Sequence, residues 1–186
     1  MGQRLNIQFE DETGVLANAY YHWSGYTSSA LTLTNNILSS NLIDDTTISN
    51  KVKAVKLLET TGAGLTLDEF NEEFTKDLYK QSTDRNNGLI AISEKGIEET
   101  MQWEEARVTI NLDSKQLHFD IYWDVNEDDY DPEDLVKMPE ETYESKLNYE
   151  NSSFENFSEL YNEYCLNSEQ GKYIVSTPDT KLHFIA

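Results

Sequence analysis

The chain has 186 residues, of which 38% are hydrophobic and 11% aromatic, and it carries a formal net charge of −21 with a pI of about 4.3. This apolar content is too high for a wholly disordered acidic protein, and the charge repels DNA, RNA and anionic membranes, whose binding requires Lys and Arg. No run reaches the roughly 20 apolar residues of a membrane span, and the N-terminus lacks the apolar core of a secretory signal. The single cysteine, Cys165, excludes an internal disulfide framework. We therefore expect a cytoplasmic protein with a basic partner and no direct contact with nucleic acid or membrane.

The first half of the chain is predicted to form a hairpin followed by helices. Leu5, Ile7 and Phe9 alternate with polar residues, and Gly14 supplies a turn before the next extended run. Apolar residues then recur at helical spacing, first in a Ser/Thr-rich stretch that packing must stabilise because its intrinsic helix propensity is poor. The expected elements are a strand over 15–23, helices over 27–40, 48–58 and 66–78, and a short strand over 88–93.

The second half begins with the clearest hairpin signal. Residues 107–112 and 117–123 alternate apolar and polar side chains on either side of a short turn, so each arm has one apolar face. His118, Asp120 and Tyr122 share the opposite face of the second arm. That composition is typical of an exposed or interacting face.

The remaining segments are less uniform. Residues 94–105 combine helical spacing with an early glycine and are assigned no element. Ser152 and Glu155 form a capping box, and aromatic residues follow at helical spacing up to Tyr164, which predicts a helix docked on the sheet. A C-terminal hairpin is expected around Pro178 and Asp179.

Together these elements predict an α+β fold, an antiparallel sheet built from hairpins and packed with three to five helices. Residues 1–123 are interpreted as an α+β core domain. Residues 124–186 are interpreted as an acidic segment, a helix and a C-terminal hairpin that pack on the same core. There is no internal repeat and no Gly/Ser-rich linker.

The negative charge is concentrated after the second hairpin. Fourteen acidic residues and two lysines lie between Asp124 and Tyr164, a net charge of −12 in 41 residues. Aromatic residues are interleaved with these acids, as in the hot spots of protein interfaces. The alternative is a solvated charge run that keeps the protein soluble. The predicted partner-binding residues are Trp123, Asp124, Glu127, Asp128, Asp129, Tyr130, Asp131, Glu133, Asp134, Glu140, Glu141 and Tyr143.

The acidic segment does not match a calcium-binding loop. Asp124, Asn126 and Asp128 fit the first three ligand positions of an EF-hand, but Asp129 stands where glycine is needed and Leu135 where the bidentate Glu is needed. The three histidines are far apart in sequence, without the spacing of a zinc site. We therefore predict no metal and no cofactor.

The segment at 20–26, YYHWSGY, concentrates residue types that active sites use. His22 is a candidate general base and Ser24 a candidate nucleophile, but there is no G-x-S-x-G elbow and no nearby acid to orient the histidine. The structural alternative is that the segment is a strand-to-helix turn. We predict no catalytic residue, and keep as an alternative a ligand pocket formed by His22, Ser24, Tyr26, Asp84 and Arg85.

The order H-W-S-G-Y-T at 22–27, a helix, V-K-A-V-K-L-L-E-T-T-G at 52–62 and then Asp84-Arg85 resembles small phage-encoded and prophage-encoded proteins of uncharacterised function. Those carry H-W-D-G-Y-P after a strand, then a helix, a V-K-A-L-like helix and a D-R pair. The resemblance covers roughly residues 5–93, with Ser24 and Thr27 in place of Asp and Pro. It implies a phage context without implying catalytic residues.

Three functions follow as hypotheses. The first is a phage protein that inhibits a basic, nucleic-acid-binding host defence protein, as an anti-CRISPR protein or nucleic-acid mimic would, using the acidic segment. The second is a small enzyme or ligand-binding protein with a site around His22 and Arg85. The third is a structural or assembly protein of the virion.

Overall fold

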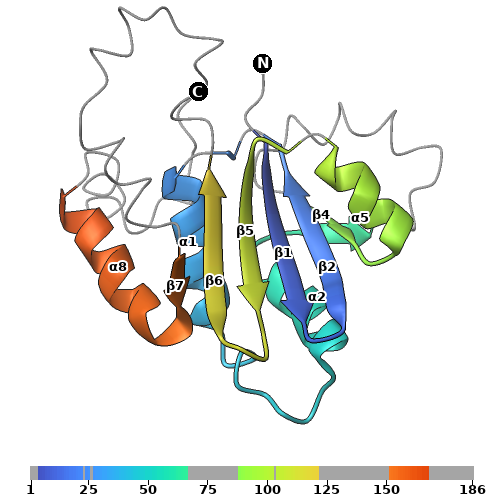
Figure 1. Cartoon of the computed structure of the whole chain (residues 1–186), viewed down its shortest axis with the longest axis horizontal. Helices are drawn as coiled ribbons and strands as arrows, with labels where there is room; N and C mark the ends of the chain where they lie inside the picture. The colour runs from blue at the N-terminus through green and yellow to red at the C-terminus, as the bar shows by residue number, and fades with distance from the viewer. Residues whose placement is uncertain are drawn as a thin grey trace, which may run out of the picture.

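The computed structural model describes residues 4–22, 24–25, 27–66, 88–102, 104–121 and 151–167. In this part of the chain a seven-stranded sheet has the order β3-β4-β2-β1-β5-β6-β7. Helices α1, α2 and α8 lie on one face of the sheet, and α5 lies on the other (Figure 1). The fold is therefore α+β, as predicted from the sequence.

The described strands are β1 (Leu5–Asp11), β2 (Gly14–Tyr21), β3 (Gly64–Thr66), β4 (Leu89–Ala91), β5 (Ala106–Asn111), β6 (Gln116–Ile121) and β7 (Asn151–Ser153). The described helices are α1 (Thr27–Leu38), α2 (Asn50–Glu59), α5 (Glu94–Met101) and α8 (Phe154–Asn167).

Two hairpins form the centre of the sheet, and both were predicted. In the first, β1 and β2 pair antiparallel around Gly14, whose φ of 121° is a conformation that side chains rarely adopt. In the second, β5 and β6 pair from Ala106–Ile121 to Asn111–Gln116. Both hairpins form locally because each arm alternates apolar and polar residues and a short turn joins the arms.

The predicted antiparallel sheet is confirmed for most strand pairs, but the pairing differs at the junction between these hairpins. β1 and β5 run parallel, with Leu5 opposite Ala106 and Glu10 opposite Asn111, and β3 and β4 also pair parallel. Parallel neighbours need a long crossover that returns the chain to the same end of the sheet. Residues 12–105 supply it for β1 and β5, so the sheet is mostly, but not entirely, antiparallel.

One face of the sheet carries the main hydrophobic core. Leu5, Ile7 and Phe9 of β1 and Val108 and Ile110 of β5 are fully buried there. These residues occupy alternate positions, so their side chains point to the same side. The helices α1, α2 and α8 contribute the buried residues that complete this core, including Leu31, Ile37, Leu57, Leu58 and Phe157.

Helix α1 compensates for its low helix propensity by packing. Eight of its residues are buried, and the Thr34 hydroxyl donates to the carbonyl of Ala30 within the helix. Helix α2 begins at Asn50 because the Ser49 side chain accepts a hydrogen bond from the Val52 amide as its N-cap. The predicted starts of these two helices were therefore correct to within two residues.

Helix α8 docks on the core as its aromatic stripe predicted. Phe157 is 1% exposed and stacks on Phe119 of β6, with ring centroids 6.1 Å apart. Tyr164 is also buried. The predicted N-cap was one residue early: Ser152 lies in β7, and Ser153 accepts a hydrogen bond from the Asn156 amide.

Residues 94–101, left unassigned by their sequence spacing, form α5. The Ser93 side chain caps this helix by accepting a hydrogen bond from the Gly96 amide. Thr66, the first residue of the helix predicted over 66–78, lies at the end of β3. The rest of that helix and the C-terminal hairpin lie outside the described residues. Within the described part of the chain, no helix combines the length and apolar character needed to cross a bilayer.

Candidate functional site: the polar face of the sheet

The face of the sheet opposite the main core is lined with polar side chains, and we call it the polar face. It is formed by the residues that alternate with the core residues along β2, β1, β5 and β6. Two rows cross these strands in register: Tyr20, Asn6, Arg107 and Asp120 in one, and Asn18, Gln8, Thr109 and His118 in the other.

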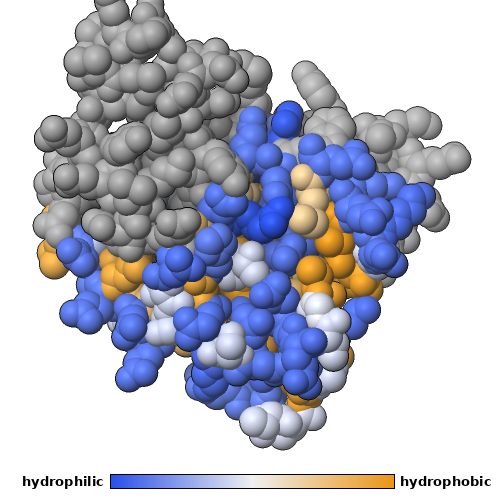
Figure 2. All heavy atoms as spheres, in the orientation of Figure 1, coloured by the Kyte–Doolittle hydropathy of each residue, from blue (hydrophilic) through white to orange (hydrophobic). Residues whose placement is uncertain are grey.

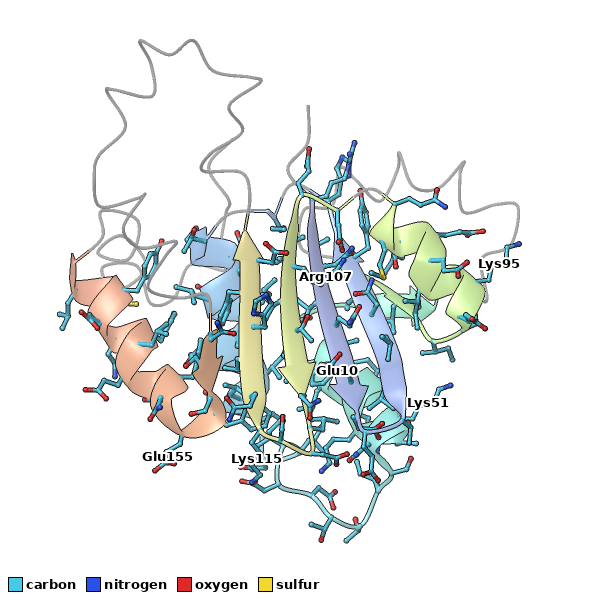
Figure 3. The ribbon with its side chains drawn as sticks, in the orientation of Figure 1. Glu10, Lys51, Lys95, Arg107, Lys115 and Glu155 are labelled. Carbon is cyan, nitrogen blue, oxygen red and sulfur yellow. The ribbon has the colours of Figure 1, made fainter. Side chains whose placement is uncertain are left out.

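This face has a covered half and an open half. Asn6, Asn18 and Tyr20, on β1 and β2, are buried, whereas Thr109 is partly exposed and His118 is exposed. Figure 2 views the open half, where hydrophilic residues dominate the described surface over β5 and β6. In Figure 3 Glu10 and Arg107 lie over this same face of the sheet. The exposed position of His118 agrees with the interpretation of its strand face as exposed or interacting.

Helix α5 covers the buried half through polar contacts rather than through a large apolar core. The Asn18 amide donates to the Thr100 hydroxyl at 2.7 Å, and the Thr100 hydroxyl donates to the Ile97 carbonyl at 2.8 Å. The Asn6 amide donates to the Thr100 carbonyl at 3.3 Å. Among the described residues, the hydrophobic cluster beneath α5 contains Ala91 and Ile97, with Met101 packed against it.

Three buried acceptors on this face have no protein donor among the described residues. They are the side-chain amide oxygens of Asn6, Gln8 and Asn18, which are 0%, 6% and 0% exposed. A buried polar atom without a partner costs about 1–3 kcal/mol. The combined cost of three such neighbouring atoms is therefore a substantial fraction of the free energy of unfolding of a typical domain.

Charged residues border the covered half of the polar face near the start of β5. Glu104 accepts hydrogen bonds from the Arg107 guanidinium and, at 2.9 Å, from the Asn6 amide. The neighbouring Glu105 accepts a hydrogen bond of 2.7 Å from the main-chain amide of Arg4. These contacts attach the segment after α5 to the starts of both β1 and β5.

His22 directly follows β2 and lies near Arg4. Its Nδ1 is 2.7 Å from the Tyr20 hydroxyl, and burial raises the pKa of Tyr20 to about 12. Burial, and then the positive charge of Arg4, lower the pKa of His22 below its usual value. Both rings are therefore neutral at pH 7. Arg4 also hydrogen-bonds Tyr20.

Two residues of the predicted alternative pocket, His22 and Ser24, are among the described residues. Ser24 is 1% exposed, and its hydroxyl donates to the His22 main-chain carbonyl at 3.4 Å. This contact favours a structural role in the turn after β2. Tyr26, Asp84 and Arg85 lie outside the described residues. In the described ranges, no group of three or more His, Cys, Asp or Glu side chains is arranged to hold a metal ion.

The acidic segment is inserted between two strands that pair with each other. β6 ends at Ile121, and β7 begins at Asn151, which pairs with His118 of β6. All twelve predicted partner-binding residues, from Trp123 to Tyr143, lie between these ends and outside the described residues. The acidic segment is therefore inserted at the β6 side of the sheet.

Sequence reasoning did not identify the buried amides of Asn6, Gln8 and Asn18 as a group. Each alternates with apolar residues, as solvent-facing strand residues do. A usable signal was present in the amphipathic spacing of Ile97 and Met101, since a helix there must cover some part of the sheet.

Comparisons with protein-family models, curated proteins and solved structures find no match to this chain.

Proposed function

We propose that this chain is an acidic binding protein that inhibits a basic, nucleic-acid-binding protein of a phage host, as an anti-CRISPR protein or nucleic-acid mimic would. The basic partner is inferred from the net charge of −21, which favours association with a positively charged surface. The phage setting and the antagonism of host defence are inferred from the resemblance of the N-terminal half to phage-encoded proteins.

The observation that carries this proposal is the position of the acidic segment in the sheet. The segment leaves at Ile121 and returns at Asn151, on strands that are hydrogen-bonded to each other. The strands that build the core pair without it. A dense run of like charge is tolerated at such a place because it removes no residue from the hydrophobic core.

The charge would act mainly on the rate of association. Opposite charges steer two proteins together, and mobile ions in solution screen that attraction. Trp123, Tyr130 and Tyr143, interleaved with the acids, would then supply the apolar contacts that slow dissociation. A partner that binds nucleic acid would lose that ligand because the acidic segment occupies the same basic surface.

The test begins with a variant in which Asp128, Asp129, Asp131, Glu133 and Asp134 are replaced by Asn or Gln. Immobilised wild-type protein captures its partner from a host lysate. The displacement of labelled nucleic acid from the purified partner is then measured. We expect wild-type displacement to fall steeply between low salt and about 0.5 M salt, and the variant to be at least about tenfold weaker at low salt.

A matched variant removes the same number of charges elsewhere. Glu12, Glu59, Glu94, Glu98 and Glu99 are exposed and all precede the acidic segment, and their replacement by Gln should leave most of the displacement activity. Affinity that is insensitive to salt, or to the substitutions at 128–134, would refute the proposal. Self-association at micromolar concentration without capture of a host protein would instead support the assembly function.

A further inference from the structure

The three unpaired amide oxygens of the polar face are neighbours. Asn6 and Gln8 are two residues apart on β1, and Gln8 lies opposite Asn18 on β2. Side chains two apart on a strand point to the same side, and directly paired residues have Cβ atoms about 5 Å apart. The three oxygens therefore belong to a single buried patch, in which Asn6 and Asn18 contact Thr100 of α5.

The orientation of two of these amides is determined by their donors. The Asn6 Nδ2 donates to the Thr100 carbonyl and to a Glu104 carboxylate oxygen, both of which only accept. The Asn18 Nδ2 donates to the Thr100 hydroxyl, whose own proton goes to the Ile97 carbonyl. Neither amide can be turned over without breaking these bonds, so the patch presents acceptors.

The charges around the patch favour a cation. Among the described residues, the polar face and its margin carry four carboxylates, from Glu10, Glu104, Glu105 and Asp120, against the two guanidiniums of Arg4 and Arg107. A ligand that satisfies several amide oxygens must bring several hydrogen-bond donors. Guanidinium and ammonium groups combine positive charge with N–H donors and have no acceptor.

We propose that this patch is a binding site for an N–H-donating cation, a guanidinium or ammonium group held by the side-chain oxygens of Asn6, Gln8 and Asn18. The proposal does not depend on the acidic segment. The group can come from a free small molecule or from a Lys or Arg side chain of a protein, because both present the same donors.

The cation would enter the patch from the open half of the polar face. Gln8 lies in register between buried Asn18 and partly exposed Thr109, and His118 is the next residue in the row. Gln8 therefore stands at the boundary between the surface covered by α5 and the surface open to solvent.

The experiment follows the side-chain amide signals of the ¹⁵N-labelled full chain by NMR. The probes are methylguanidinium and methylammonium, and tetramethylammonium has the same charge without N–H donors. We expect saturable shifts of the amide signals of Asn6, Gln8 and Asn18 with the first two cations only. Shifts that never saturate, or that tetramethylammonium reproduces, would overturn the proposal.

The matched variants are Gln8→Met and Gln116→Met. Both preserve side-chain length, and Gln116 is an exposed residue of β6 on the same face. We expect Gln8→Met to raise the dissociation constant of methylguanidinium at least about tenfold, because an acceptor is lost, and Gln116→Met to leave it unchanged. Asn18→Leu provides a second test of the same patch, with folding of each variant checked by circular dichroism.

Two further outcomes are decisive. If the amide signals of the patch show contacts only to ordered water at every probe concentration, the patch is a hydration site and the proposal is wrong. If binding is found, N-acetylarginine methylamide identifies the source. Affinity equal to that of methylguanidinium supports a free small molecule, and affinity at least about tenfold tighter supports a protein side chain.

Discussion

The side chain of Asn18 donates a 2.7 Å hydrogen bond to the hydroxyl of Thr100, a residue 82 positions later in the chain. Both side chains are buried, at 0% and 4% exposure. This bond joins the first hairpin to α5 where few apolar contacts are available. The position of α5 over the sheet therefore depends in part on buried hydrogen bonds.

Thr100→Val should destabilise the protein by about 1–3 kcal/mol, because it leaves the Asn18 amide buried without its acceptor. Asn18→Leu should be destabilising too. The double variant should lose less than the sum of the two single losses, since no polar group is then left without its partner at this contact. Urea unfolding measures all three free energies, and simple additivity would show that the bond does not couple α5 to the sheet.

Gly88→Ala should destabilise the fold by about 1–3 kcal/mol through overpacking. A Cβ atom at Gly88 would lie 2.5 Å from Cε1 of Tyr21, a buried ring whose hydroxyl is hydrogen-bonded to Thr61. Gly64 is the matched control because a Cβ there meets no atom within 4 Å. Thermal unfolding of the two alanine variants compares them directly, and equal midpoints would mean that the Tyr21 ring moves aside freely.

Phe157→Ala should cost about 3–5 kcal/mol, the usual range for removing a buried aromatic ring. Phe157 stacks on Phe119 and also on Tyr161, with centroids 6.1 and 6.0 Å apart. Leu166→Ala on the same helix should change little, because Leu166 is 70% exposed. If urea unfolding shows a loss below about 1 kcal/mol for Phe157→Ala, α8 does not unfold together with the sheet.

Arg4→Met should raise the pKa of His22, because it removes a nearby positive charge, while burial continues to hold that pKa below the usual value of 6.5. Lys115→Met, at the opposite end of the sheet, controls for the loss of one charge. NMR titration of the His22 ring measures its pKa in both variants. No change on Arg4→Met would mean that burial alone sets the pKa.

The lowered pKa of His22 has a predictable effect on the free energy of unfolding. The folded protein binds a proton at His22 less readily than the unfolded chain does, since its pKa is lowered. The contribution of His22 to stability is therefore complete above about pH 6.5 and decreases as the pH falls from there toward the folded pKa. In Arg4→Met this decrease should be smaller, and urea unfolding at several pH values would reveal it.

The local elements could be predicted because their signals are local. The alternation of Leu5, Ile7 and Phe9 and the turn at Gly14 are enough to predict the first hairpin. The stripe through Phe157 and Tyr164 is enough to predict α8. The parallel pairing of β1 with β5 could not be predicted in this way, because no periodicity within either strand specifies a partner that lies far along the chain.

The covered polar face was beyond prediction for a related reason. Asn6 and Gln8 alternate with apolar residues like side chains that face water, and only the placement of α5 buries them. The hypothesis that His22 and Arg85 share a pocket stays untested, because Arg85 lies outside the described residues. Among the described residues, Arg4, which directly precedes β1, contributes a positive charge at His22. Cross-strand neighbours of this kind depend on register, which single-strand patterns do not encode.

The parallel pairing of β1 with β5 also has a consequence during synthesis. Leu5 and Ala106 are register partners, so β1 has no neighbour on that side until about a hundred further residues have been made. At roughly 5–20 residues per second the delay is on the order of ten seconds. During that time β2 can cover one edge of β1, while the other presents free backbone groups and an apolar row to neighbouring nascent chains. The yield of native protein should therefore increase when translation through residues 15–105 is accelerated.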